Sequence, residues 1–129
     1  RLDQLQAFPK NTRMTAILHR HGNLTILELP AEGAQLDALD VIGETYGQEV
    51  DWVAVPASRL PDAFFRLRSG ILGEFTQKFV NYRLKLAILG DVSRHVEASE
   101  AFAAYVAETN RQGQLRFVDD MPALLARLS

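Results

Sequence analysis

Apolar runs of strand length alternate with amphipathic segments along most of this chain. Two β-rich runs, TAILHRH and LTILELP, flank Gly22 and Asn23, a pair of residues that predicts a tight hairpin turn. The later runs VDWVAVP and LKLAILGD are typical of strands buried on both faces, and QLRFVD predicts a fifth, short strand. The pattern therefore predicts five strands, of which the first two form a hairpin.

Segments with apolar residues at helical spacing separate and follow these strands. A helix is predicted in residues 34–47, with an inner face formed by Leu36, Leu39, Ile42 and Tyr46. SGILGEFTQKFVNYR and VEASEAFAAYVAETNRQG predict two longer helices, and DMPALLARLS predicts a last one that Asp119 or Asp120 caps. The order ββαβαβαβα predicts a single α/β domain with a mixed sheet of about five strands and four helices.

Composition narrows the class of protein. The chain has 129 residues, no cysteine and a net charge of −2, so neither a thiolate site nor a strongly basic nucleic-acid surface is expected. No apolar run approaches the ~20 residues that span a bilayer, and the chain does not open with a signal-peptide pattern. We expect a cytoplasmic protein that contacts neither membrane nor nucleic acid. Residues 1–13 are expected to be an extension, added by cloning or left by processing, before a domain at 14–129.

The element order, and the segments DWVAVP, RSGILGEFTQKF and KLAILGD, resemble the STAS domain of bacterial anti-sigma-factor antagonists. Ser69 and Gly70 match the Ser-Gly pair that carries the phosphoacceptor in that family. Leu67 and Arg68 depart from it, because the family has an aspartate and a first serine there. The resemblance implies a STAS-like fold and a regulatory module.

Longer phrases identify residues 14–129 as a member of a bacterial family described only as a domain of unknown function, number four thousand one hundred and eighty. These phrases are DWVAVPASRL, FFRLRSGILGEFTQKFVNYRLKLAILGDVSRHVEAS and RQGQLRFV. Membership in this family implies no activity.

Ser69 has three interpretations. It can cap the helix that follows, by accepting a backbone N–H bond. It can instead be a phosphoacceptor or anion contact, since helix N-termini attract phosphate and Arg59, Arg66 and Arg68 are near in sequence. A serine nucleophile is disfavoured, because no Gly-x-Ser-x-Gly elbow surrounds it.

Two further segments carry polar chemistry. GDVSRH, residues 90–95, ends a predicted parallel strand, where ligands of α/β sheets gather, so Asp91, Ser93 and His95 either contact a ligand or only stabilise a loop. His19 and His21 share one face of a strand, but a metal site needs a third ligand that the sequence does not identify. We therefore expect no metal and no cofactor.

The sequence favours a non-enzymatic regulatory or protein-interaction module and assigns no catalytic residue. Its working surface would join residues 58–70 with residues 91–95 and bind a protein partner or an anionic ligand. One alternative is a small-molecule or nucleotide-binding protein, or a weak enzyme, that uses the strand ends. Another is a domain that forms homodimers through the edge of the hairpin. The candidate contact residues are Arg59, Arg66, Arg68, Ser69, Gly70, Asp91, Ser93 and His95.

Overall fold

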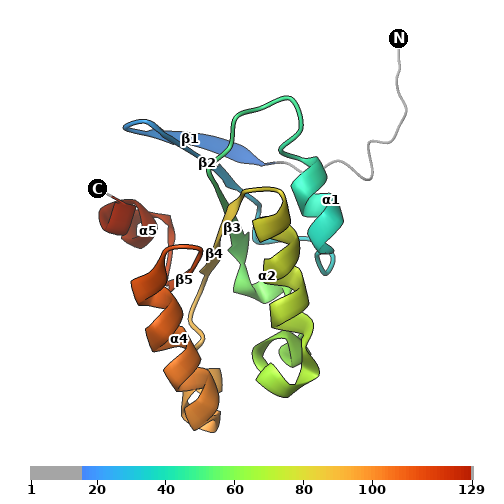
Figure 1. Ribbon diagram of the computed structural model, residues 1–129, viewed down its shortest axis with the longest axis vertical. Coiled ribbons are helices and arrows are strands. Elements are labelled where there is room, and N and C mark those ends of the chain that lie inside the picture. Colours follow the sequence, from blue (N-terminus) through green and yellow to red (C-terminus); the bar gives the residue numbers. More distant parts are fainter. Residues whose placement is uncertain (1–15, 129) are drawn as a thin grey trace.

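A computed structural model describes residues 16–128, apart from the side chain of Gln112, and shows a five-stranded mixed sheet (Figure 1). The strands lie in sequential order: β1 (Ile17–His21), β2 (Leu24–Glu28), β3 (Trp52–Pro56), β4 (Lys85–Leu89) and β5 (Leu115–Val118). β1 is antiparallel to β2, whereas β2 to β5 are parallel to one another. The predicted α/β class, hairpin and strand count are confirmed. The extension predicted at residues 1–13 lies outside the described residues.

Residues 16–128 contain five α-helices, one more than the sequence predicted. They are α1 (Ala38–Gly43), α2 (Ile71–Asn81), α3 (Ser93–Ala98), α4 (Glu100–Gln112) and α5 (Met121–Leu128). The segment predicted as one helix after β4 is divided at Ser99, whose backbone is extended and whose hydroxyl accepts the Phe102 N–H at 3.1 Å. Because Ser99 caps α4, the preceding turn forms the separate helix α3, which includes Ser93 and His95.

Three short 3₁₀ turns join β3 to α2: η2 (Ala57–Arg59), η3 (Asp62–Phe65) and η4 (Leu67–Ser69). The sequence predicted one helical turn in this connector. Its side chains reach the core, since Phe64 is fully buried and packs edge-on against Phe75 of α2.

The helices cover the two faces of the sheet unequally. Right-handed crossovers between strands in sequential order place their helices on the same face. α1, α2 and α4 accordingly share one core with alternate strand residues such as Val53, Val55 and Ile88. α5 covers the other face, where Trp52 and Ala87 pack against its Leu124. In Figure 1 the strands lie between α5 and the pair α1 and α2.

The predicted inner face of α1 is wrong at two positions. Leu36 and Ile42 are buried, but Leu39 is 52% and Tyr46 is 69% exposed. The helix begins after Asp37, whose carboxylate accepts the Leu39 N–H at 3.1 Å, and it ends at Gly43. A helix of this length does not continue the spacing as far as Tyr46.

None of the helices in residues 16–128 is long and apolar enough to cross a membrane.

Candidate functional site

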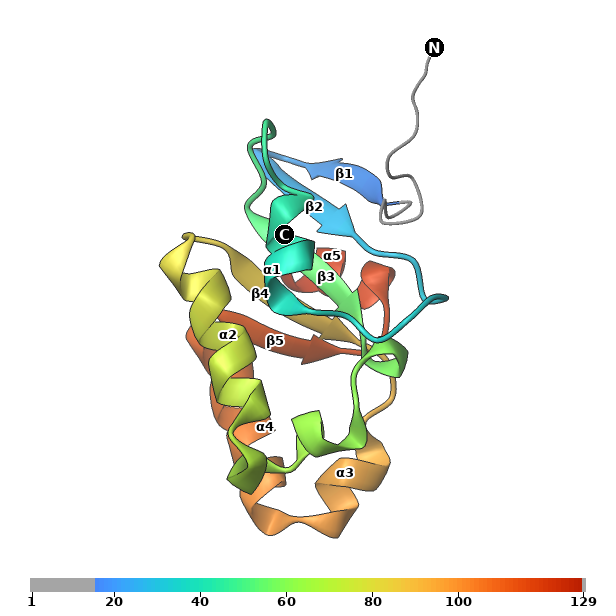
Figure 2. The ribbon, with the colours of Figure 1, turned by 90° about the vertical axis from the view of Figure 1, so that its right-hand side faces the viewer.

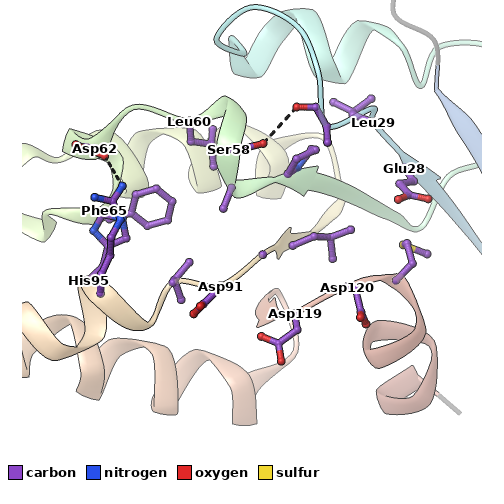
Figure 3. A pocket seen from close by; sticks show the side chains of 18 residues that line it. Glu28, Leu29, Ser58, Leu60, Asp62, Phe65, Asp91, His95, Asp119 and Asp120 are labelled. Carbon is purple, nitrogen blue, oxygen red and sulfur yellow. Dashed lines mark hydrogen bonds and ion pairs between the residues drawn. The ribbon is translucent and has the colours of Figure 1, made fainter.

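A cleft of about 530 Å³ opens where the four parallel strands end (Figure 3). The carboxyl ends of parallel strands meet at one edge of a sheet, and each strand here is followed by a residue that lines the cleft. Figure 2 shows the connector after β3 and helix α3 extending beyond the same end of the sheet. The lining residues at the strand ends include Glu28, Leu29, Pro56, Ala57, Leu89, Gly90, Asp91, Asp119 and Asp120.

Apolar and polar side chains share the wall of the cleft. Leu29, Leu60, Val92 and Met121 line it and are nearly buried. The Phe65 and His95 rings stack with centroids 4.3 Å apart at an interplanar angle of 12°. This stack joins η3 to α3, so the connector after β3 and the helix after β4 form one side of the cleft together.

Gly90 brings two strand ends close together. Its φ is 137°, which favours glycine, and a Cβ at this position would lie 3.2 Å from the Ala57 Cβ. A larger residue here would strain the backbone and press against the end of β3.

Polar groups of the cleft are mostly acidic, and several are held by hydrogen bonds or ion pairs. The Arg94 guanidinium lies 3.0 Å from an Asp62 oxygen. Asp91 accepts the Ser93 N–H at 2.9 Å, which lowers the pKa of this carboxyl. Burial, and then the nearby Arg94, lower the pKa of His95, so this imidazole is neutral at pH 7.

The structure brings two of the residues predicted from sequence into the cleft and leaves six outside its lining. Asp91 and His95 line it, and Ser93 lies beside them through its bond to Asp91. The other five predicted contact residues, Arg59, Arg66, Arg68, Ser69 and Gly70, belong to the connector and the start of α2. Arg66 and Arg68 are exposed there.

Arg59 is a buried structural residue rather than part of a surface patch. Its side chain is 8% exposed, and it donates from Nε to the Ala34 carbonyl at 2.9 Å and from Nη1 to the Pro30 carbonyl at 3.1 Å. Gly33 has a φ of 135°, and a Cβ at this position would lie 2.7 Å from the Arg59 Nη2. The guanidinium therefore fixes the loop that leaves β2.

Ser69 precedes the cap residue of α2, and its hydroxyl accepts a backbone N–H at the helix start, the kind of bond that one interpretation predicted. Its Oγ accepts the Ile71 N–H at 3.2 Å and lies 2.6 Å from the Ala63 carbonyl and 2.9 Å from the Arg66 carbonyl, either of which its hydroxyl can donate to. Gly70 follows with a φ of 78° as the N-terminal cap residue of α2. Phosphorylation of Ser69 stays a prediction.

A family model described as "Domain of unknown function (DUF4180)" matches residues 21–128. The chain belongs to the DUF4180 family. This confirms the membership predicted from the long sequence phrases. Comparisons with curated proteins and with solved structures gave no match. The STAS resemblance and the regulatory role that it implies stay predictions, so function must be argued from the cleft.

The sequence did not single out four acidic residues of the cleft as contacts. Glu28, Asp119 and Asp120 end or follow parallel strands, so the rule that drew attention to Asp91 could have found them. Asp120 was expected only as a helix cap, and it does accept the Ala123 N–H at 2.9 Å. Asp62 gave no such signal, because it lies in an irregular connector.

The two histidines of β1 do not form a metal site with other described residues. His19 Nε2 lies 2.7 Å from Glu28 Oε1, across the hairpin. Within residues 16–128 no three histidine or carboxylate side chains are grouped so that they could hold a metal ion.

Proposed function

We propose that this domain binds a small molecule in the cleft at the carboxyl ends of β2 to β5. The position of the cleft is the observation that carries the proposal, because open α/β sheets bind their ligands at this edge. Its volume of about 530 Å³ also lies within the range of ~300–1,000 Å³ that is usual for ligand pockets. Its lining combines apolar side chains, which can cover a ligand, with polar groups that can orient it.

Binding is favoured over hydrolysis by the geometry around His95. A serine nucleophile needs a base within hydrogen-bond reach. The Asp91 carboxylate bonds the Ser93 backbone N–H, and the His95 ring stacks on Phe65 without a hydrogen bond to any residue in 16–128. These neighbours on one short segment do not form a nucleophile–base pair.

The test is a fragment screen of the full chain by two-dimensional ¹H–¹⁵N NMR, with acidic, neutral and basic fragments. Binding at the cleft is expected to shift the amide signals of Gly90, Asp91 and Asp119. Ser58→Phe, which fills the cleft from an exposed position, should abolish these shifts, whereas Gln77→Phe on exposed α2 surface should not. Hits that map elsewhere, or that bind the Ser58→Phe variant equally well, would overturn the proposal.

The regulatory module expected from the sequence is a second proposal, which the exposure of Ser69 favours. Arg66 and Arg68 are exposed beside it, and Arg66 is close enough to help lower the pKa of His95 in the cleft. A phosphate on Ser69 would add about −2 of charge next to the cleft. Native mass spectrometry of protein purified from its own host tests this. A phosphate that maps to Ser69 or a co-purifying protein supports it, and a bare, unmodified chain contradicts it.

A further inference from the structure

The charge of the cleft lining is strongly one-sided. The lining includes five carboxylates, those of Glu28, Asp62, Asp91, Asp119 and Asp120. Its basic side chains are Arg94, which is ion-paired with Asp62, and His95, whose pKa is lowered by burial and by Arg94. A cavity of this kind attracts cations and repels phosphates and carboxylates. At this cleft, the anionic ligand expected from the sequence is disfavoured.

A metal ion does not fit the distribution of these carboxylates. They come from the ends of three strands and from η3, and no three of them are grouped as metal ligands within residues 16–128. Divalent cations need several oxygen ligands at short range. A larger cation, whose charge is accompanied by apolar surface, matches a wide cleft that is lined by both carboxylates and apolar side chains.

Asp119 is the lining carboxylate with the most unused bonding capacity. Glu28, Asp62, Asp91 and Asp120 each hold a hydrogen bond or ion pair. Asp119 is exposed and makes neither with any residue in 16–128. It follows Val118, which pairs with Leu89 in the sheet, so Asp119 lies near Asp91 at the neighbouring strand end (Figure 3).

We propose that the cleft selects a small organic cation, an amine or a guanidinium compound, whose charge faces Asp119 and Asp91. Its apolar part would lie on Leu89, Val92 and Met121, which line the same cavity. This inference rests on the proposed binding function and adds the chemical class of the ligand. Burial of the ligand's apolar part would provide most of the affinity, and the carboxylates would select the ligand by its charge.

Three phenyl compounds of similar size and different charge test the class of ligand: phenethylamine, 2-phenylethanol and 3-phenylpropionate. Each is titrated into the full chain while the amide shifts at the cleft are followed. We expect phenethylamine to bind about tenfold tighter than 3-phenylpropionate, and this preference to shrink when salt is added. Asp119→Asn should weaken phenethylamine about threefold and leave 2-phenylethanol unchanged. Asp40→Asn, on α1 outside the cleft, is the matched control and should change neither.

The outcomes separate this inference from the function on which it rests. If 3-phenylpropionate or 2-phenylethanol binds the cleft as well as the amine does, selection by charge is overturned and the binding function stands. If Asp119→Asn and Asp40→Asn weaken the amine equally, the assignment of Asp119 is overturned. If no probe binds the cleft, the inference fails, and the binding function then depends on the fragment screen alone.

Discussion

Replacing Arg59 tests whether this residue stabilises the loop after β2 or serves a partner. Arg59→Met keeps the apolar stem of the side chain and removes both bonds, to the carbonyls of Ala34 and Pro30. A hydrogen bond that involves a charged group contributes about 1.5–3 kcal/mol. The loop is largely exposed, so water can hydrate the released carbonyls. We therefore expect a loss of about 2 kcal/mol in the free energy of unfolding, below the sum for two bonds.

Gly33 provides an independent measure of the same contact. Gly33→Ala strains the backbone at a φ of 135° and sets a methyl group 2.7 Å from the Arg59 Nη2. In the Arg59→Met background the collision with the guanidinium is absent, whereas the backbone strain remains. The double variant should therefore be about 1 kcal/mol more stable than the two single effects predict when added.

Urea denaturation followed by tryptophan fluorescence measures these differences. Trp52 is the only tryptophan of the chain and is 2% exposed, so its emission reports unfolding. A loss of about 2 kcal/mol lowers the urea midpoint by about 1 M. Arg68→Met, at an exposed arginine, is the control and should change stability by less than about 0.5 kcal/mol. If Arg59→Met is as stable as the control and its effect simply adds to that of Gly33→Ala, the structural role assigned to Arg59 is refuted.

Three further predictions concern single polar groups. Ser69→Ala should cost about 1 kcal/mol of stability through the lost hydrogen bonds of its hydroxyl with the Ile71 N–H and the connector carbonyls, and an unchanged urea midpoint would argue against these bonds. Asn110→Ala should cost about 1–3 kcal/mol and speed hydrogen exchange at the Phe117 amide, because the Asn110 side chain bonds both the N–H and the carbonyl of Phe117. His95 should titrate below its ordinary pKa, as read from its ring proton shifts. Since the folded state then binds fewer protons than the unfolded state, His95 contributes a loss of stability as pH falls below 6.5; a midpoint at or above 6.5 would contradict this.

The sequence predicted the sheet well because strand signals here are local. Buried runs such as Trp52–Pro56 are apolar without interruption, and Gly22 marks the hairpin turn directly with a φ of 64°. Helix limits were harder to predict. A single serine, Ser99, divides a segment whose apolar spacing continues on both sides. Asp37 delays the start of α1, and the helix ends at Gly43, before Tyr46.

The candidate site was predicted less completely because its parts are distant in sequence. Asp91 and His95 were found from the end of one strand, yet the cleft also needs Glu28 and Asp119 from two others. Arg59 showed the opposite error. It lies close to Arg66 and Arg68 in sequence, but only tertiary structure shows that its guanidinium is used by the loop at residues 30–34.

Homodimer formation through the hairpin stays a prediction, and the two edges of the sheet show how to test it. At the β5 edge, Asn110 already occupies the outward N–H and carbonyl of Phe117. At the β1 edge, the register with β2 leaves the N–H and carbonyl groups of Leu18 and Arg20 pointing away from the sheet.

Leu18→Pro removes one of these outward N–H groups without removing a bond to β2, so it should block strand pairing and keep the fold. Sedimentation of the wild type and the variant over a range of concentrations measures the effect. A wild-type dimer that becomes monomeric in Leu18→Pro supports pairing through β1. A dimer that persists in the variant uses another surface, and a wild type that stays monomeric at every concentration contradicts the homodimer.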